Sequence, residues 1–96
     1  MTFKLILWHE LSDELNRLPD KTRRIIKSAL VRLEEEPFPG NHGDKENLVL
    51  RGGVVIYRLH ISRSYTAFYD IDTEEKLVIV QEILPIGQAH KKYGYY

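Results

Sequence analysis

The stretch that decides the fold is VIYRLHISRSYTAFYDIDTEEKLVIVQEIL, residues 55–84. In residues 55–61, one side of the chain is apolar throughout and consists of Val55, Tyr57, Leu59 and Ile61. The positions between them are Ile56, Arg58 and His60, and this two-residue period is typical of a half-buried strand. Two further strands and two tight connections follow: strands at 65–71 and 76–84, connections at 62–64 and 72–75. Because short turns join neighbouring strands in antiparallel pairs, this half of the chain predicts an antiparallel sheet.

Two helices are predicted upstream of the sheet. Leucines at i, i+4 and i+7 mark one face of a helix over residues 9–18, and Pro19 ends it. Asp20 is a suitable N-cap for a second helix, which must end before Pro37. The apolar stripe of this second helix is formed by Ile26, Ala29, Leu30 and Leu33.

The order of elements predicts the fold class. A short apolar strand at residues 3–8 precedes the helices, and a loop at 37–47 leads to Leu48, Val49 and the Gly52-Gly53 turn. We therefore expect an α+β domain of order β-α-α-β-β-β(-β). Its two N-terminal helices would pack on one face of an antiparallel sheet and leave the other face free.

The length and composition of the chain limit the number of domains and the kinds of functional site that it can have. The 96 residues suit one domain spanning 1–96, and the absence of cysteine excludes disulfides and thiolate metal sites. The 14 basic and 14 acidic residues cancel, so a nucleic-acid site would depend on a local patch. Neither a signal peptide nor a membrane span is expected, which agrees with a cytoplasmic protein.

Two groups of residues have a composition suited to phosphate chemistry. Arg58 and His60 share one face of their strand, where a cation beside a histidine suits an anion; an ordinary solvated sheet face is the alternative. The tail, residues 90–96, interleaves lysines with tyrosines that can stack on unpaired bases, and its alternative is a frayed terminus. Arg51 before the glycine pair and Arg63 at a hairpin tip are further candidate phosphate contacts, or simply turn residues.

The elements together resemble the RelE/ParE toxin superfamily of type II toxin–antitoxin systems, over nearly the whole chain. The matching pieces, in order, are Leu15-Asn16-Arg17-Leu18-Pro19, Leu50-Arg51-Gly52, Val55-Ile56-Tyr57-Arg58-Leu59, Tyr65-Thr66-Ala67-Phe68-Tyr69 and Ile86-Gly87. The resemblance to RelE implies an endonuclease that cuts messenger RNA in the ribosome. It implies a metal-free attack of the 2′-hydroxyl on phosphate, with no cofactor, and a cognate antitoxin as partner.

The resemblance also implies roles for particular residues. Arg58 and His60 match the catalytic basic pair of the third strand, and Tyr93 matches a catalytic C-terminal tyrosine, with His90 as a further catalytic candidate. The expected RNA-binding residues are Arg51, Arg63, Lys91 and Lys92, and no metal ligands are expected.

Two positions depart from the family pattern. Thr66 and Ala89 stand where the resemblance leads us to expect arginine. Losing a phosphate-stabilising arginine lowers the rate of such a reaction by orders of magnitude. Two alternatives therefore stay open: a non-nuclease inhibitor of DNA gyrase like ParE, and a degenerate member without activity.

Overall fold

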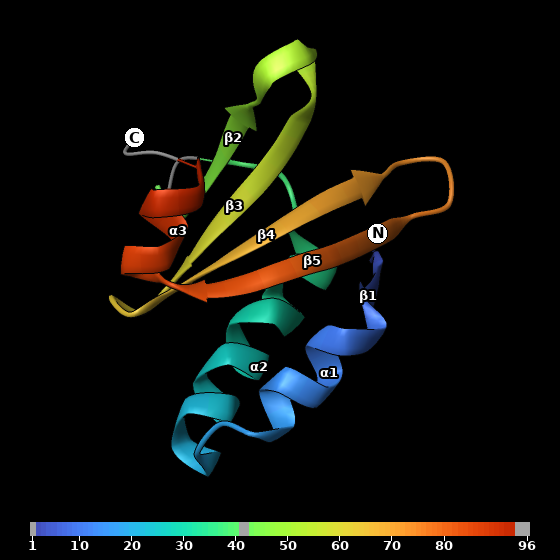
Figure 1. Cartoon of the computed structure of the whole chain (residues 1–96). Helices are drawn as coiled ribbons and strands as arrows, with labels where there is room; N and C mark the ends of the chain where they lie inside the picture. The colour runs from blue at the N-terminus through green and yellow to red at the C-terminus, as the bar shows by residue number, and fades with distance from the viewer. Residues whose placement is uncertain (1, 41–42, 94–96) are drawn as a thin grey trace.

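The computed structural model describes residues 2–40 and 43–93, with the side chains of His90, Lys92 and Tyr93 outside the description. Five strands and three α-helices form the domain, as Figure 1 shows. In chain order they are β1 (Lys4–Leu7), α1 (His9–Asn16), α2 (Asp20–Glu35), β2 (Lys45–Val49), β3 (Val55–Ile61), β4 (Tyr65–Asp72), β5 (Leu77–Pro85) and α3 (Ile86–Tyr93), with a 3-10 turn at Arg51–Gly53 between β2 and β3. The predicted α+β class is confirmed.

The strands form one sheet in the order β1-β5-β4-β3-β2. Strands β2 to β5 pair antiparallel, as the short turns predict. Strand β1 differs from the expectation of a purely antiparallel sheet, because it pairs parallel to β5, with Lys4 opposite Leu77. A parallel neighbour requires a long connection, and here both helices and strands β2 to β4 lie between β1 and β5.

Helices α1 and α2 cover one face of the sheet and close the larger core. The predicted stripe of α2 is buried, and Leu30 and Leu33 are among its most enclosed residues. The sheet contributes Leu59 and Ile61 from β3, together with Val78 and Val80 from β5. The predicted packing of both helices on one sheet face is thus observed (Figure 1).

Tyr69 is the buried polar residue of this core. Its hydroxyl donates a hydrogen bond to the Pro37 carbonyl oxygen at 2.6 Å, and its ring stacks on Tyr57 at 5.5 Å between centroids. Burial raises the pKa of the Tyr69 hydroxyl well above its ordinary value, with the Asp44 charge adding to the effect. The phenol therefore stays protonated and holds the segment after α2 against β4.

Two predicted element boundaries are wrong. Asp20 is the first residue of α2 rather than its N-cap, since Pro19 takes the N-cap position and the Asp20 carboxylate pairs with Arg23. Strand β2 begins at Lys45, inside the predicted loop 37–47. Its first three residues are polar because β2 is the edge strand of the sheet, and an edge strand needs no apolar alternation.

The expectation of a free second face is also wrong. Helix α3 returns over this face, where Ala89 packs into a second buried cluster with Leu48, Ile56 and Phe68. Residues 86–93, for which the sequence predicts no regular element, form this helix. None of the helices in the described ranges is long and apolar enough to cross a membrane.

Candidate functional site

The candidate site begins with Arg58 on β3. The alternation of this strand directs Arg58 to the α3 side of the sheet, where it lies opposite Phe68 of β4. The expectation that Arg58 stands exposed on this face is wrong, because the residue is only 2% exposed. Its guanidinium is paired with the carboxylate of Glu46. Arg58 is therefore a buried, ion-paired cation in this conformation of the protein.

Glu46 joins Arg58 to His60. Its Oε2 accepts a hydrogen bond from Nη2 of Arg58, and its Oε1 lies 3.6 Å from Nε2 of His60. The side chains of Glu46 and His60 are 41% and 31% exposed, so both are accessible from solvent. A carboxylate thus lies within ion-pair distance of a histidine, and both groups are of the kind that general acid–base catalysis uses.

Sequence reasoning missed Glu46. The residue lies on β2 directly opposite Arg58, in a segment predicted to be loop. A signal for it exists in the chain, since the buried Leu48 and Glu46 are two residues apart and therefore share a strand face. If the strand that contains Leu48 is extended two residues toward the N-terminus, it includes Glu46, whose carboxylate then lies beside Arg58.

Helix α3 lies on the same face of the sheet. Ala89 of α3 is 1% exposed, packed near Phe68, the neighbour of Arg58 in the sheet. Lys91 on the same helix is exposed and lines a shallow hollow with Glu82, Leu84 and Gln88. The side chains of the other predicted tail residues, His90, Lys92 and Tyr93, lie outside the described part of the structure.

Arg51 and Arg63 lie apart from this cluster and from each other. Arg51 is in the turn before β3, where Gly52 and Gly53 adopt φ values of 85° and 82° that favour glycine. Arg63 is in the turn after β3, so the full length of this strand, roughly 20 Å, separates the two arginines. Both are exposed.

The two positions that depart from the family pattern are both buried. Thr66 is 1% exposed and lies opposite His60 in the sheet. Ala89 is on the side of α3 that packs against the sheet. Small side chains that are almost fully buried thus occupy both positions in this conformation.

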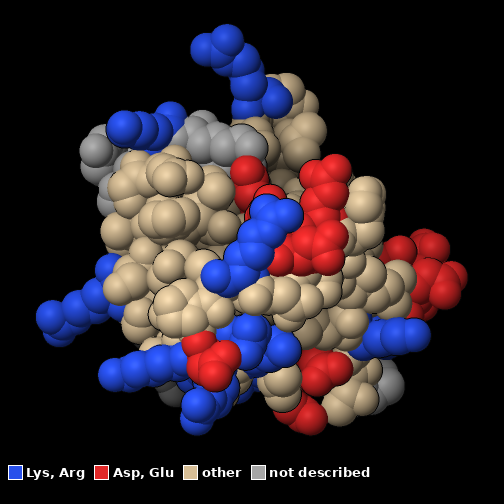
Figure 2. All heavy atoms as spheres, turned by 60° about the horizontal axis from the view of Figure 1, so that its bottom comes forward, with Lys and Arg blue, Asp and Glu red and all other residues tan. Residues whose placement is uncertain are grey.

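Basic and acidic side chains are only partly separated on the surface. Figure 2 views the molecule from the side of α1 and α2, with acidic atoms mostly in the centre and right of the view and basic atoms more frequent on the left. Within residues 2–40 and 43–93, no three histidine or acidic side chains are grouped closely enough to hold a metal ion.

Comparison with known proteins identifies the fold. No family model and no curated protein sequence matches the chain. Among solved structures, a chain of the archaeal RelE–RelB complex from Pyrococcus horikoshii OT3 matches with a TM-score of 0.74 and 24% identity, covering 92% of this chain and 99% of that one.

Two bacterial structures agree. A chain of the toxin–antitoxin complex RelBE2 from Mycobacterium tuberculosis matches with a TM-score of 0.70 and 17% identity, covering 86% of this chain and 96% of that one. A mutant of the E. coli toxin RelE in the free state matches with a TM-score of 0.62 and 20% identity, covering 97% and 95%. The predicted resemblance is confirmed at the level of structure: the chain has the fold of the RelE toxins.

Proposed function

We propose that this protein is the toxin of a type II toxin–antitoxin pair and cuts messenger RNA in the ribosome. The observation that carries the proposal is the accessible Glu46–His60 pair, held by Arg58 on the α3 face of a RelE-like sheet. The similar chains in RelE–RelB complexes support an antitoxin as a partner of this chain. A ribosomal target would require the protein to act in the cytoplasm.

The proposed reaction needs a base, an acid and positive charge. The Glu46–His60 pair takes the proton of the 2′-hydroxyl, whose oxygen forms a bond to the adjacent phosphorus. The bond from phosphorus to the 5′-oxygen breaks, and the leaving oxygen receives a proton. The products are a 2′,3′-cyclic phosphate and a 5′-hydroxyl. By the resemblance, Tyr93 gives that proton, with His90 as the second candidate.

Arg58 takes a different role from the one first expected. Because it is buried and paired with Glu46, it orients the carboxylate rather than touching the phosphate in this conformation. Exposed cations are then needed for the phosphate charge. We assign RNA binding to Lys91 and Lys92 on α3 and to Arg51 and Arg63 at the two ends of β3.

The test is a primer-extension map of messenger RNA in cells after brief induction of the protein. Cleavage within translated codons is expected for the wild type. Glu46→Gln and His60→Ala should each reduce it by a factor on the order of 100, because each removes part of the acid–base pair. Glu74→Gln, in the exposed β4–β5 turn, is the matched control and should cut like the wild type.

Circular dichroism of the purified variants separates loss of chemistry from loss of fold. Intact messages with the folded wild-type protein would contradict the nuclease proposal. Equal cleavage by the wild type and His60→Ala would leave the protein a nuclease but remove the histidine from the mechanism.

A second function is favoured by one specific observation. Thr66 and Ala89 are buried where the nuclease pattern calls for arginines, which suits an inhibitor of DNA gyrase like ParE that needs no phosphate chemistry. Growth arrest with intact messages and a DNA-damage response would identify that function. No effect on growth would indicate a degenerate member that is kept for binding its antitoxin.

A further inference from the structure

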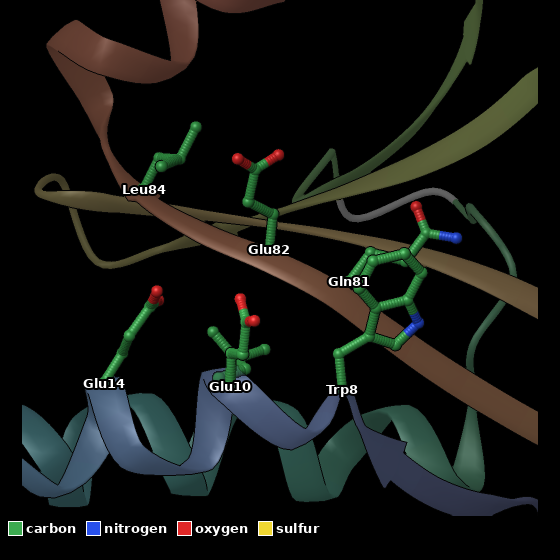
Figure 3. A pocket seen from close by; sticks show the side chains of 7 residues that line it. Trp8, Glu10, Glu14, Gln81, Glu82 and Leu84 are labelled. Carbon is green, nitrogen blue, oxygen red and sulfur yellow. The ribbon is translucent and has the colours of Figure 1, made fainter.

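A groove lies between α1 and the end of β5, on the opposite edge of the sheet from Glu46. Its volume is about 370 Å³, and Figure 3 shows its walls: Glu10 and Glu14 of α1 point toward β5, while Glu82 and Leu84 of β5 point away from α1. A smaller hollow of about 170 Å³ extends along α1 toward Pro85 and shares Leu11 and Glu14 with the groove. The two hollows therefore adjoin each other along α1.

Strand β5 has an open edge at this groove. Strand β1 pairs with β5 only up to Val80, whose carbonyl oxygen accepts the last bond of the pair from the Trp8 amide at 3.1 Å. Beyond Val80, no strand among the described residues pairs with this side of β5. Gln81 is an extra residue in the pairing with β4, and such bulges occur at sheet edges and binding sites.

Trp8 stands at the entrance of the groove. It is 56% exposed, more than is usual for so large an apolar ring. The indole lies where the chain turns from β1 into α1, so it is attached to two fixed elements (Figure 3). A tryptophan face is the best aromatic partner for a guanidinium or ammonium group.

The charge of the walls indicates what the groove accepts. Glu10 and Glu14 lie one turn apart on the same side of α1, and both carboxylates point toward β5. These two carboxylates repel a phosphate backbone, so RNA and DNA are unsuited to this groove. Arginine and lysine side chains are attracted to the carboxylates and to the Trp8 ring.

We propose that this groove binds an extended basic segment of a partner protein, which adds a strand to the free edge of β5. Backbone hydrogen bonds to residues 81–84 would supply affinity without regard to sequence. Arginine or lysine side chains over Trp8, Glu10 and Glu14 would select the segment. The inference goes beyond the proposed function, because peptide binding at this edge requires no RNA cleavage.

The test uses the intrinsic fluorescence of Trp8, the single tryptophan of the chain. The probe is a synthetic peptide of about ten residues that alternates arginine with valine and contains no aromatic side chain. A saturable change in tryptophan emission is expected, weakened by added salt. The same peptide with glutamate in place of arginine should produce no such change.

Matched charge reversals locate the site. The double variant Glu10→Lys/Glu14→Lys should weaken binding of the arginine peptide by about tenfold or more. Glu74→Lys/Glu75→Lys makes the same change of net charge in the β4–β5 turn and should leave the affinity within about twofold of wild type. All four glutamates are exposed, so both variants are expected to fold.

Trp8→Ala, measured with a labelled peptide by fluorescence anisotropy, should also weaken binding by about tenfold. The proposal is overturned if the arginine peptide gives no saturable change up to about 1 mM, or if both double variants bind equally. His60→Ala should bind the peptide like the wild type. Failure of peptide binding is thus distinguishable from failure of the nuclease proposal.

Discussion

The two faces of the sheet are stabilised by different means. Toward α1 and α2, the buried cluster is apolar throughout, apart from the Tyr69 hydroxyl, which is hydrogen-bonded. Toward α3, a cluster of four buried residues lies next to the ion pair of Arg58 and Glu46. The first face supplies most of the stability of the fold, and the second gives up apolar area to hold charged groups in position.

The largest expected effect of a single substitution is on the helix face. Leu30→Ala should lower the free energy of unfolding by about 3 kcal/mol, because Leu30 is 2% exposed and its loss leaves a cavity in the larger core. Urea denaturation measures the loss. Its neighbour Val31 is 54% exposed, so Val31→Ala should cost less than about 0.5 kcal/mol. If Leu30→Ala and Val31→Ala lowered the free energy of unfolding equally, the buried and exposed sides of α2 would not differ in their contribution to stability.

A smaller effect is expected when the ion pair of the α3 face is broken. Glu46→Ala should cost about 2 kcal/mol, because a guanidinium that is 2% exposed loses its carboxylate. Replacing both partners, as in Glu46→Ala/Arg58→Met, should recover part of the loss, since no buried charge then remains. If the single variant is as stable as the wild type in urea denaturation, the pair serves chemistry without contributing to stability.

The smallest global effect is expected at α3 itself. Ala89→Arg should detach the helix from the sheet, because the buried position has no space for the longer side chain. Since α3 is a terminal element, global unfolding should change by less than about 1 kcal/mol. Hydrogen exchange should show lost protection in α3 and unchanged protection in α2. Loss of protection in both helices would mean that the two faces unfold together.

The sequence predicts the helix face well for a physical reason. The stripe on α2 and the alternation in residues 55–61 are local patterns, and each records which side of an element is buried. Such patterns predict the α+β fold class and the order of the strands after the helices. They also predict that Arg58 and His60 share one face of their strand.

The α3 face is harder to predict because its burial depends on contacts distant in sequence. Arg58 pairs with Glu46 of an edge strand and lies opposite Phe68, which is in the same buried cluster as Ala89 of α3. Neither the helical state of residues 86–93 nor the start of β2 at Lys45 has a strong local signal. The sequence therefore predicts the cation Arg58, but it predicts neither its partner Glu46 nor its burial.

The parallel pairing of β1 with β5 has a consequence for how the protein is made. It joins residue 4 to residue 77, so the two helices and strands β2 to β4 must be synthesised before the pair can form. At ordinary rates of translation this interval is roughly 4–15 s. During that time the apolar sides of α1 and α2 lack the strand that helps to cover them. Such distant contacts slow folding, so the nascent chain exposes aggregation-prone surface until β5 has been synthesised.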